Sequence, residues 1–162
     1  VTRGALLQMQ DEAELAAVLA HEVAHVTQRH IVNALNVRAR DSDAASGLGR
    51  LLSAGNDTVR AVFEQAVEQA VGILFESGYS QQDELEADRV AMFVLAQTGY
   101  DPRALDRYLV RVQTHEADKL ANTHPPSARR QQALRAVIRD EKFDALQYAT
   151  LPKRFAEHVH VE

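Results

Sequence analysis

Apolar residues recur at spacings of three and four along most of the chain, and this is the period of an amphipathic α-helix. Breaks in the pattern coincide with glycine, proline and capping residues, which mark where helices begin and end. The pattern predicts a long helix over 11–37, a second from 62 to Gly78, a third from Ser80 to Gly99, a fourth that starts at Asp101 and Pro102, and a last one after Pro126. We therefore expect a mainly α fold, with at most a small sheet or edge strand from the N-terminal end.

The first predicted helix begins with Asp11 and Glu14, which are spaced like a capping box. With His21 set at 0° and about 100° per residue, one far face lies between about 120° and 200°. That face carries Leu15, Leu19, Val23, Val26 and His30, while Val18 and Val32 fall on the same side as His21. A helix that is apolar nearly all round is a buried one, so we expect this helix to lie in the core.

Three stretches do not follow the helical period. Residues 1–4 are typical of the end of a strand, so we expect the chain to begin partway into a longer parent domain. Turn-forming residues dominate 38–60, and the sequence leaves open whether this loop is a functional lid or a linker. His158 and His160 alternate with an apolar residue as in a strand, and we do not expect a second metal site there.

The composition is that of a globular protein, with 46% hydrophobic and 25% charged residues among 162. This length suits a single domain over 1–162, and no apolar run is long enough to span a bilayer. The absence of cysteine excludes disulfides, thiol nucleophiles and cysteine metal ligands. A net charge of −5 argues against a nucleic-acid partner. We therefore expect the arginines of the last helix to form a solvated face: Arg129, Arg130, Arg135 and Arg139.

The stretch His21-Glu22-Val23-Ala24-His25 carries the strongest chemical signal in the chain. Residues four apart on a helix lie about 40° apart, so His21 and His25 can direct two imidazoles at one metal ion. Glu22 lies one step round the helix and can reach a metal-activated water, as the general base of a metalloprotease does. With 7 histidines in the chain, random placement would give the pattern in about 2% of shuffled sequences.

A second, acidic stretch at 84–88 supplies the groups that a catalytic zinc site still lacks. Such a site has three protein ligands and one open position, and two histidines with one glutamate are a common set. Glu84 and Asp88 share a helix face, so Glu84 can be the third ligand and Asp88 can accept the free ring N–H of a ligand histidine. Glu86 points about 200° away from Glu84 and is not expected to contribute. Without the histidine motif, these residues would indicate only an exposed acidic helix start.

Three blocks resemble the signatures of one family: the histidine motif at 21–25, the acidic block at 84–89, and Thr123-His124-Pro125-Pro126. It is the zinc metallopeptidase family of the CAAX prenyl proteases and HtpX, and the likeness is closest to its soluble, periplasmic BepA-like members. The resemblance extends to about residue 140 and implies a zincin-like helical domain of the gluzincin type in the bacterial periplasm. The zinc ligands that it implies are His21, His25 and Glu84, and the implied catalytic base is Glu22. The family's upstream strands are missing here, and 38–60 has no counterpart.

Rival zinc classes fail on the sequence itself. The metzincin pattern needs glycine three residues and histidine six residues after the second motif histidine, where this chain has Gln28 and Ile31. Hydrolases with a cysteine ligand are excluded because the chain has no cysteine. His30 lies opposite the ligand face of the predicted helix, so we expect a hydrogen-bonded histidine rather than a third ligand. Zn²⁺ is the expected metal, although this ligand set accepts several divalent ions.

The sequence thus predicts a zinc-dependent endopeptidase that acts on protein or peptide substrates, with misfolded or envelope proteins as the expected class. The alternative is a zinc-stabilised, chaperone-like binding module with latent proteolysis. His124 has three open interpretations. It is a loop histidine bonded to backbone, a donor that steadies the oxyanion, or a ligand that fills the fourth zinc position and keeps the enzyme latent.

Overall fold

The computed structural model describes residues 1–33, 61, 68, 72, 78–113, 124 and 128–160. The elements in these ranges are α1 (Arg3–Gln8), α2 (Glu12–Thr27), α6 (Gln81–Thr98), α7 (Ala104–Gln113), α9 (Ala128–Asp140), the 3₁₀ turn η1 (Phe143–Ala145) and α10 (Pro152–His158). Within them, the one β pairing is an isolated parallel bridge between Tyr100 and Ala149. The predicted mainly α fold is confirmed. None of the described helices is long and apolar enough to cross a membrane.

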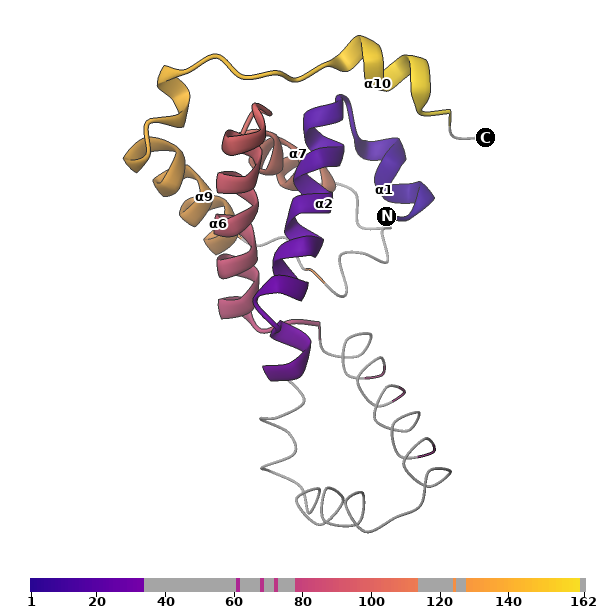
Figure 1. Cartoon of the computed structure of the whole chain (residues 1–162), viewed down its shortest axis with the longest axis vertical. Helices are drawn as coiled ribbons and strands as arrows, with labels where there is room; N and C mark the ends of the chain where they lie inside the picture. The colour runs from indigo at the N-terminus through magenta and orange to yellow at the C-terminus, as the bar shows by residue number, and fades with distance from the viewer. Residues whose placement is uncertain are drawn as a thin grey trace.

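Helices α2 and α6 lie side by side, α9 packs against the other side of α6, and α7 lies behind the pair (Figure 1). Small side chains make the contact between α2 and α6. The shared core contains Ala13, Ala17 and Ala20 of α2 and Ala91, Met92 and Leu95 of α6. Because the distance between packed helices depends on the side chains between them, alanines allow these two helices to approach closely. Polar side chains on α2 and on α6 can therefore come within contact distance of one another.

Helix α6 confirms the predicted third helix at both ends. Ser80 Oγ accepts a hydrogen bond from the Asp83 N–H at 3.1 Å, and Asp83 Oδ2 accepts one from the Ser80 N–H at 3.3 Å. This capping box fixes where the helix starts. Gly99 ends it in the left-handed region at φ 83°, where glycine is favoured. The cap places Glu84 in the first turn, where the helix dipole stabilises a negative charge.

Only one face of α2 is buried, so the prediction of a helix enclosed on nearly all sides is wrong. Its alanines and the two motif histidines are buried, whereas Leu19, Val23 and Val26 are 48%, 55% and 74% exposed. In the described part of the chain, α2 packs on α6 and α7 through its alanines, while Val18 and Leu15 join the cluster that contains Phe155 of α10. The angular pattern counts apolar residues and does not show which of them will find a partner.

The first helix ends at Thr27 instead of continuing to about residue 37, which corrects its predicted length. Arg29 has φ 58°, in the left-handed region, and its N–H donates to Val26 O at 3.1 Å. A residue in this conformation turns the chain out of the helix. Helical residues resume at His30 and are described as far as residue 33, so 34–37 lie outside the described residues.

Both strand-like predictions at the chain ends are wrong. Residues 3–8 form α1, and Thr2 Oγ1 caps it by accepting the Ala5 N–H at 3.2 Å. His158 is the last residue of α10, and its Nδ1 lies 2.9 Å from Arg154 O. A pattern of three or four residues is too short to separate the two-residue period from the helical one.

Two predicted segments lie mostly outside the described residues. Nothing in 38–60 is described, and within the predicted helix of 62–77 only two residues are, Glu68 and Gly72, both helical. Gly78, predicted to end that helix, has φ 64°. This conformation is typical of the residue that follows a helix.

A buried network of ion pairs ties the start of α2 to α7. Glu14 is fully buried and accepts hydrogen bonds from Arg111 at 2.7 and 2.9 Å. Arg107 donates to Asp101 Oδ2 at 2.6 Å and to Oδ2 of Asp11, the N-cap of α2, at 3.0 Å. Because buried charges require partners, the network fixes the position of α2 against α7.

We predict that the ion pairs of Asp101 with Arg103 and Arg107 make the stability of the fold sensitive to acid. Burial raises the pKa of Asp101, but hydrogen bonds from Arg103 and Arg107 outweigh it and hold this pKa below its ordinary value. The unfolded state therefore takes up the proton more readily, and the stabilisation present at neutral pH is lost as the pH falls below about 4. Asp101→Asn should lower the free energy of unfolding at neutral pH by about 1.5–3 kcal/mol and flatten its decline in acid.

Urea denaturation of the parent and the variant from neutral pH down to about pH 3 measures both effects. Asp140→Asn removes a carboxylate from an exposed pair with Arg139 and is the matched control, expected to change neither quantity. If Asp101→Asn lost stability in acid as steeply as the parent, the assignment of the acid sensitivity to Asp101 would be wrong.

Candidate metal centre

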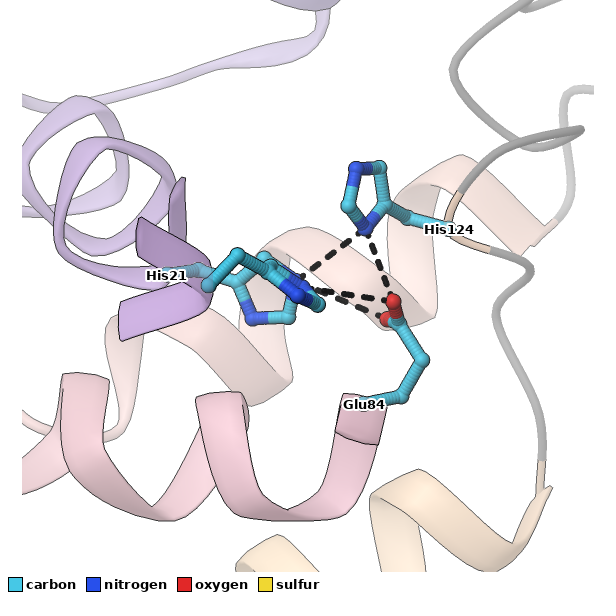
Figure 2. A group of neighbouring side chains, drawn as sticks. His21, Glu84 and His124 are labelled. Carbon is cyan, nitrogen blue, oxygen red and sulfur yellow. Dashed lines mark hydrogen bonds and ion pairs between the residues drawn. The ribbon is translucent and has the colours of Figure 1, made fainter. Parts of the chain in front are cut away.

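The structure brings His21 and His25 of α2 together with Glu84 of α6 and with His124. Each of the four offers one donor atom, and these atoms all lie within 4.8 Å of one another. Figure 2 shows His21, Glu84 and His124 pointing toward one another from α2, α6 and the segment before α9. His21, His25 and Glu84 are buried, and His124 is half-buried.

The close contacts among these four side chains are similar in length to the distances between neighbouring ligands of a tetrahedral ion. His21 Nε2 lies 3.0 Å from His25 Nε2 and 3.5 Å from Glu84 Oε2, and His25 Nε2 lies 3.3 Å from Glu84 Oε1. His124 Nδ1 lies 3.3 Å from His21 Nε2 and 2.8 Å from Glu84 Oε1. Zinc ligands about 2.0–2.1 Å from the ion lie roughly 3.3 Å apart in a tetrahedron. These five contacts of 2.8–3.5 Å bracket this value, although they involve both oxygens of Glu84, and with one donor atom per residue the four atoms lie within 4.8 Å of one another.

The chemistry of the donors also fits a divalent cation. Glu84 Oε2 is buried and has no aligned hydrogen bond within the described residues, although Arg130 Nη1 lies 2.7 Å away, so a carboxylate lone pair can still face a cation. Ring nitrogens of His21 and His25 converge on the same carboxylate. Imidazole nitrogens and a carboxylate oxygen suit Zn²⁺ and other divalent first-row metals.

Electrostatics set the protonation states of these groups. Burial raises the pKa of Glu84, but hydrogen bonds with His124, His21 and His25 and the charge of Arg130 bring it well below its ordinary value. Burial lowers the pKa of His25, and the neighbouring His21 adds to this, so His25 is neutral near pH 7. An ionised glutamate and a neutral histidine are the forms that bind a metal. Burial lowers the pKa of His21, but Asp88 and Glu84 outweigh it and raise it to about 8.

Glu22 lies at the open rim of the centre. Its side chain is 43% exposed, and its Oε1 lies 3.6 Å from His124 Nε2. It follows His21 directly in α2, so the same helix that presents the two ring nitrogens also presents this carboxylate. The position suits a group that exchanges a proton with water at the edge of the site.

Asp88 lies behind the centre, beside the ring of His21. Its Oδ1 is 3.0 Å from His21 Nδ1, the ring nitrogen that faces away from the other donors. Arg130 donates to both carboxylate oxygens of Asp88, from Nε at 2.8 Å and from Nη2 at 2.7 Å. Burial raises the pKa of Asp88, but the bonds from Arg130 and His21 outweigh it and lower it. Asp88 is therefore an ionised partner for the His21 ring.

Arg130 is 2% exposed, so its assignment to a solvated arginine face is wrong, whereas Arg129, Arg135 and Arg139 are exposed as predicted. Besides binding Asp88, Arg130 places Nη1 2.7 Å from Glu84 Oε2 and 3.3 Å from the carbonyl oxygen of His124. The sequence does contain a pattern that indicates the inward position of Arg130. Arg130 is four and seven residues before the inward Leu134 and Val137, so all three share one helix face.

Two further residues enclose His25. Tyr79 stacks on the His25 ring with centroids 3.9 Å apart and an interplanar angle of 19°. No feature of the sequence indicated this role for Tyr79, because the contact depends on how the chain enters α6. His30 is buried, and its Nδ1 lies 2.9 Å from His25 Nδ1. The prediction of a hydrogen-bonded histidine at position 30 is confirmed.

Comparisons with known proteins point to one family. Residues 1–138 match the family model described as Peptidase family M48. A putative β-barrel assembly-enhancing protease of Vibrio cholerae serotype O1 is 33% identical over 158 residues, which cover 96% of this chain and 32% of that protein. The metalloprotease LoiP of Escherichia coli strain K12 is 29% identical over 80% of this chain and 51% of its own length. The mitochondrial metalloendopeptidase OMA1 of Arabidopsis thaliana is 26% identical over 83% of this chain and 26% of its own.

We predict that Arg130 is a main electrostatic support of the centre. Arg130→Met leaves Glu84 and Asp88 buried without their guanidinium, and removing one partner of a buried ion pair costs about 3–5 kcal/mol of unfolding free energy. Added zinc should recover part of this loss, because a bound dication supplies positive charge to the same carboxylates. Urea denaturation with and without zinc measures both effects.

Arg129→Met is the matched control, since Arg129 is exposed and donates only to Gln81 among the described residues. It should change the free energy of unfolding by no more than about 0.5 kcal/mol. Equal effects of the two substitutions would contradict the role given to Arg130.

Proposed function

Because this chain belongs to peptidase family M48, we propose that it is a zinc-dependent endopeptidase that hydrolyses peptide bonds of protein substrates. The observation that carries the proposal is the convergence of His21, His25 and Glu84 beside the exposed carboxylate of Glu22. Two histidines and a glutamate are a common ligand set of catalytic zinc. A structural metal site has no use for a general base at its rim, and this supports the enzymatic role.

The proposed mechanism divides the work between the metal and the chain. When bound, the metal supplies Lewis acidity, which polarises the scissile carbonyl and makes water more acidic. Glu22 accepts the proton of the attacking water and then passes it to the leaving amine. Asp88 orients the His21 ring through Nδ1, and Arg130 holds both Asp88 and Glu84 in place.

Substrate and location extend the same proposal. We propose misfolded or envelope proteins as substrates and the bacterial periplasm as the location, with residues 1–162 acting as a single metallopeptidase domain. The name of the Vibrio cholerae relative, a β-barrel assembly-enhancing protease, supports envelope substrates. This chain spans 32% of the length of that relative, so the substrates of the longer protein are proposed for this chain and not assigned to it.

The decisive test of the enzymatic role is Glu22→Gln. The substitution removes the base and leaves the three metal ligands in place, so the variant should bind one zinc per chain. Cleavage of casein or of an unfolded outer-membrane protein should fall by about 10²–10⁴-fold, the usual contribution of a general base. Glu157→Gln, at an exposed position of α10, is the matched control and should retain full activity. Undiminished cleavage by Glu22→Gln would remove Glu22 from the mechanism.

A second candidate function is a zinc-stabilised, chaperone-like module with latent proteolysis. The position of His124 favours it, because a fourth protein ligand is typical of a closed structural zinc site. Measuring both holding activity and cleavage in the parent and in Glu22→Gln distinguishes the two functions. If Glu22→Gln still holds unfolded protein in solution while neither the parent nor any variant cuts a substrate, the binding function is the better description.

We propose that His124 is the fourth metal ligand and keeps the enzyme latent until substrate displaces it. Its Nδ1 lies 2.8 Å from Glu84 Oε1 and 3.3 Å from His21 Nε2, which supports a place in the ligand set. The alternative is a donor to the oxyanion, supported by the Nε2 atom that faces Glu22 at 3.6 Å. The interpretation as a histidine bonded only to backbone has less support, since the ring contacts these side chains.

The two proposed roles of His124 predict opposite changes in activity. His124→Ala should raise the rate of casein cleavage if the residue is a displaceable ligand, because the fourth position is then free for water. The rate should fall by about 10²–10³-fold if the residue is an oxyanion donor. Our proposal expects the rise, measured at saturating zinc so that occupancy is equal in both proteins. An unchanged rate would exclude both roles.

A further inference from the structure

His30 contacts the second motif histidine from behind. Its Nδ1 lies 2.9 Å from His25 Nδ1, the ring centroids are 4.9 Å apart, and the rings meet edge to face. His30 is 1% exposed, so water does not compete for this contact. We propose that His30 is a positioning residue that fixes the orientation and the tautomer of His25 for metal binding. The inference rests on the metal site proposed above.

The break after α2 creates this contact. On an uninterrupted helix His25 and His30 would point about 140° apart, and their rings would not meet. Arg29 adopts φ 58°, and its carbonyl oxygen accepts the Asn33 N–H at 3.0 Å as a new helical turn begins. The left-handed residue changes the direction of the chain, and His30, the next residue, turns back onto His25. The break is therefore part of the site and does more than end a helix.

The contact selects one tautomer for each ring. His25 Nε2 faces the donor centre, 3.0 Å from His21 Nε2 and 3.3 Å from Glu84 Oε1. A metal needs the lone pair of that nitrogen, so the N–H of the neutral His25 ring must lie on Nδ1. His30 Nδ1 must then accept this N–H, and the N–H of His30 lies on its Nε2. A ligand histidine generally needs such a partner on its second nitrogen.

The outer edge of His30 faces negative charge, which favours this arrangement. His30 Nε2 lies 3.5 Å from Glu86 Oε2 and 3.9 Å from Asp83 Oδ1, both on α6. Neither contact is an aligned hydrogen bond within the described part of the chain. The carboxylates nevertheless attract the Nε2–H by charge, and this leaves Nδ1 as the acceptor. Glu86 is half exposed, so its share is smaller than that of the buried imidazole contact.

The two motif histidines are thus supported differently. His21 has a carboxylate next to its second nitrogen, Asp88 at 3.0 Å, whereas His25 has the imidazole of His30 there. Tyr79 covers one face of the His25 ring, so this ring is restrained both on its edge and on its face. Both second nitrogens therefore lie within 3.0 Å of another polar group, but within the described residues only the contact between His25 and His30 is an aligned hydrogen bond.

Two substitutions of His30 distinguish the effect of losing its hydrogen-bond acceptor from the effect of changing the size of the side chain. His30→Asn places a side-chain oxygen near the position of Nδ1 and keeps an acceptor for His25. His30→Gln places its amide near the position of Nε2 and loses that acceptor. Both variants are polar, uncharged and made in the full chain with Glu22→Gln, so that cleavage does not interfere. The measurement is zinc affinity by competition with a chromophoric chelator, together with the melting temperature of each metal-free protein.

We expect His30→Gln to bind zinc about 10–100-fold more weakly than the parent, and His30→Asn to stay within about threefold. Asp88→Asn is the reference for the loss of a ligand's second partner and should match His30→Gln. Arg29→Gly keeps the left-handed turn without the side chain, so its zinc affinity should equal that of the parent. Equal affinities of the Asn and Gln variants, whether high or low, would overturn the role of His30. A Glu22→Gln parent that binds no zinc would instead overturn the proposed metal site itself.

Discussion

The centre depends on the burial of two carboxylates, Glu84 and Asp88, which are each 1% exposed and one helical turn apart. Two negative charges at this spacing would repel each other and would resist removal from water unless positive groups faced them. Arg130 meets both from α9, while the motif histidines of α2 meet them from the other side. The packing of α9 and α2 on opposite sides of α6 is therefore also an electrostatic requirement.

Four of the six site residues that the sequence proposed form two pairs, each on a continuous helix at a spacing of four. His21 and His25 share a face of α2, and Glu84 and Asp88 share a face of α6, so local periodicity was enough to predict that each pair would lie together. The mainly α fold and the caps of α6 followed from the same local signals. For these groups, knowledge of the tertiary structure was not needed.

The groups that the sequence missed depend on long-range packing or on a break in periodicity. Arg130 appeared to belong with three exposed arginines, and only the packing of α9 on α6 shows that it turns inward. The relation of His30 to His25 was invisible because the angular projection assumed an unbroken helix, and Arg29 breaks it. The exposed face of α2 was missed for a related reason. Periodicity reports which residues share a face, and only the tertiary structure decides whether another element covers that face.

A charge count links the buried network to the rim of the site. Among the described residues, three carboxylates line the centre, Glu84 and Asp88 in its interior and Glu22 at its edge, and one guanidinium, that of Arg130, opposes them. Once His21 loses its proton, as metal binding requires, two negative formal charges remain, and a dication among the donor atoms would balance them. Because Glu22 is the one exposed member, it is also the carboxylate that can gain and lose a proton without leaving a buried charge unpaired. Under the proposed function, the geometry thus separates the two buried carboxylates that would hold the metal site together from the exposed one that would act as the base.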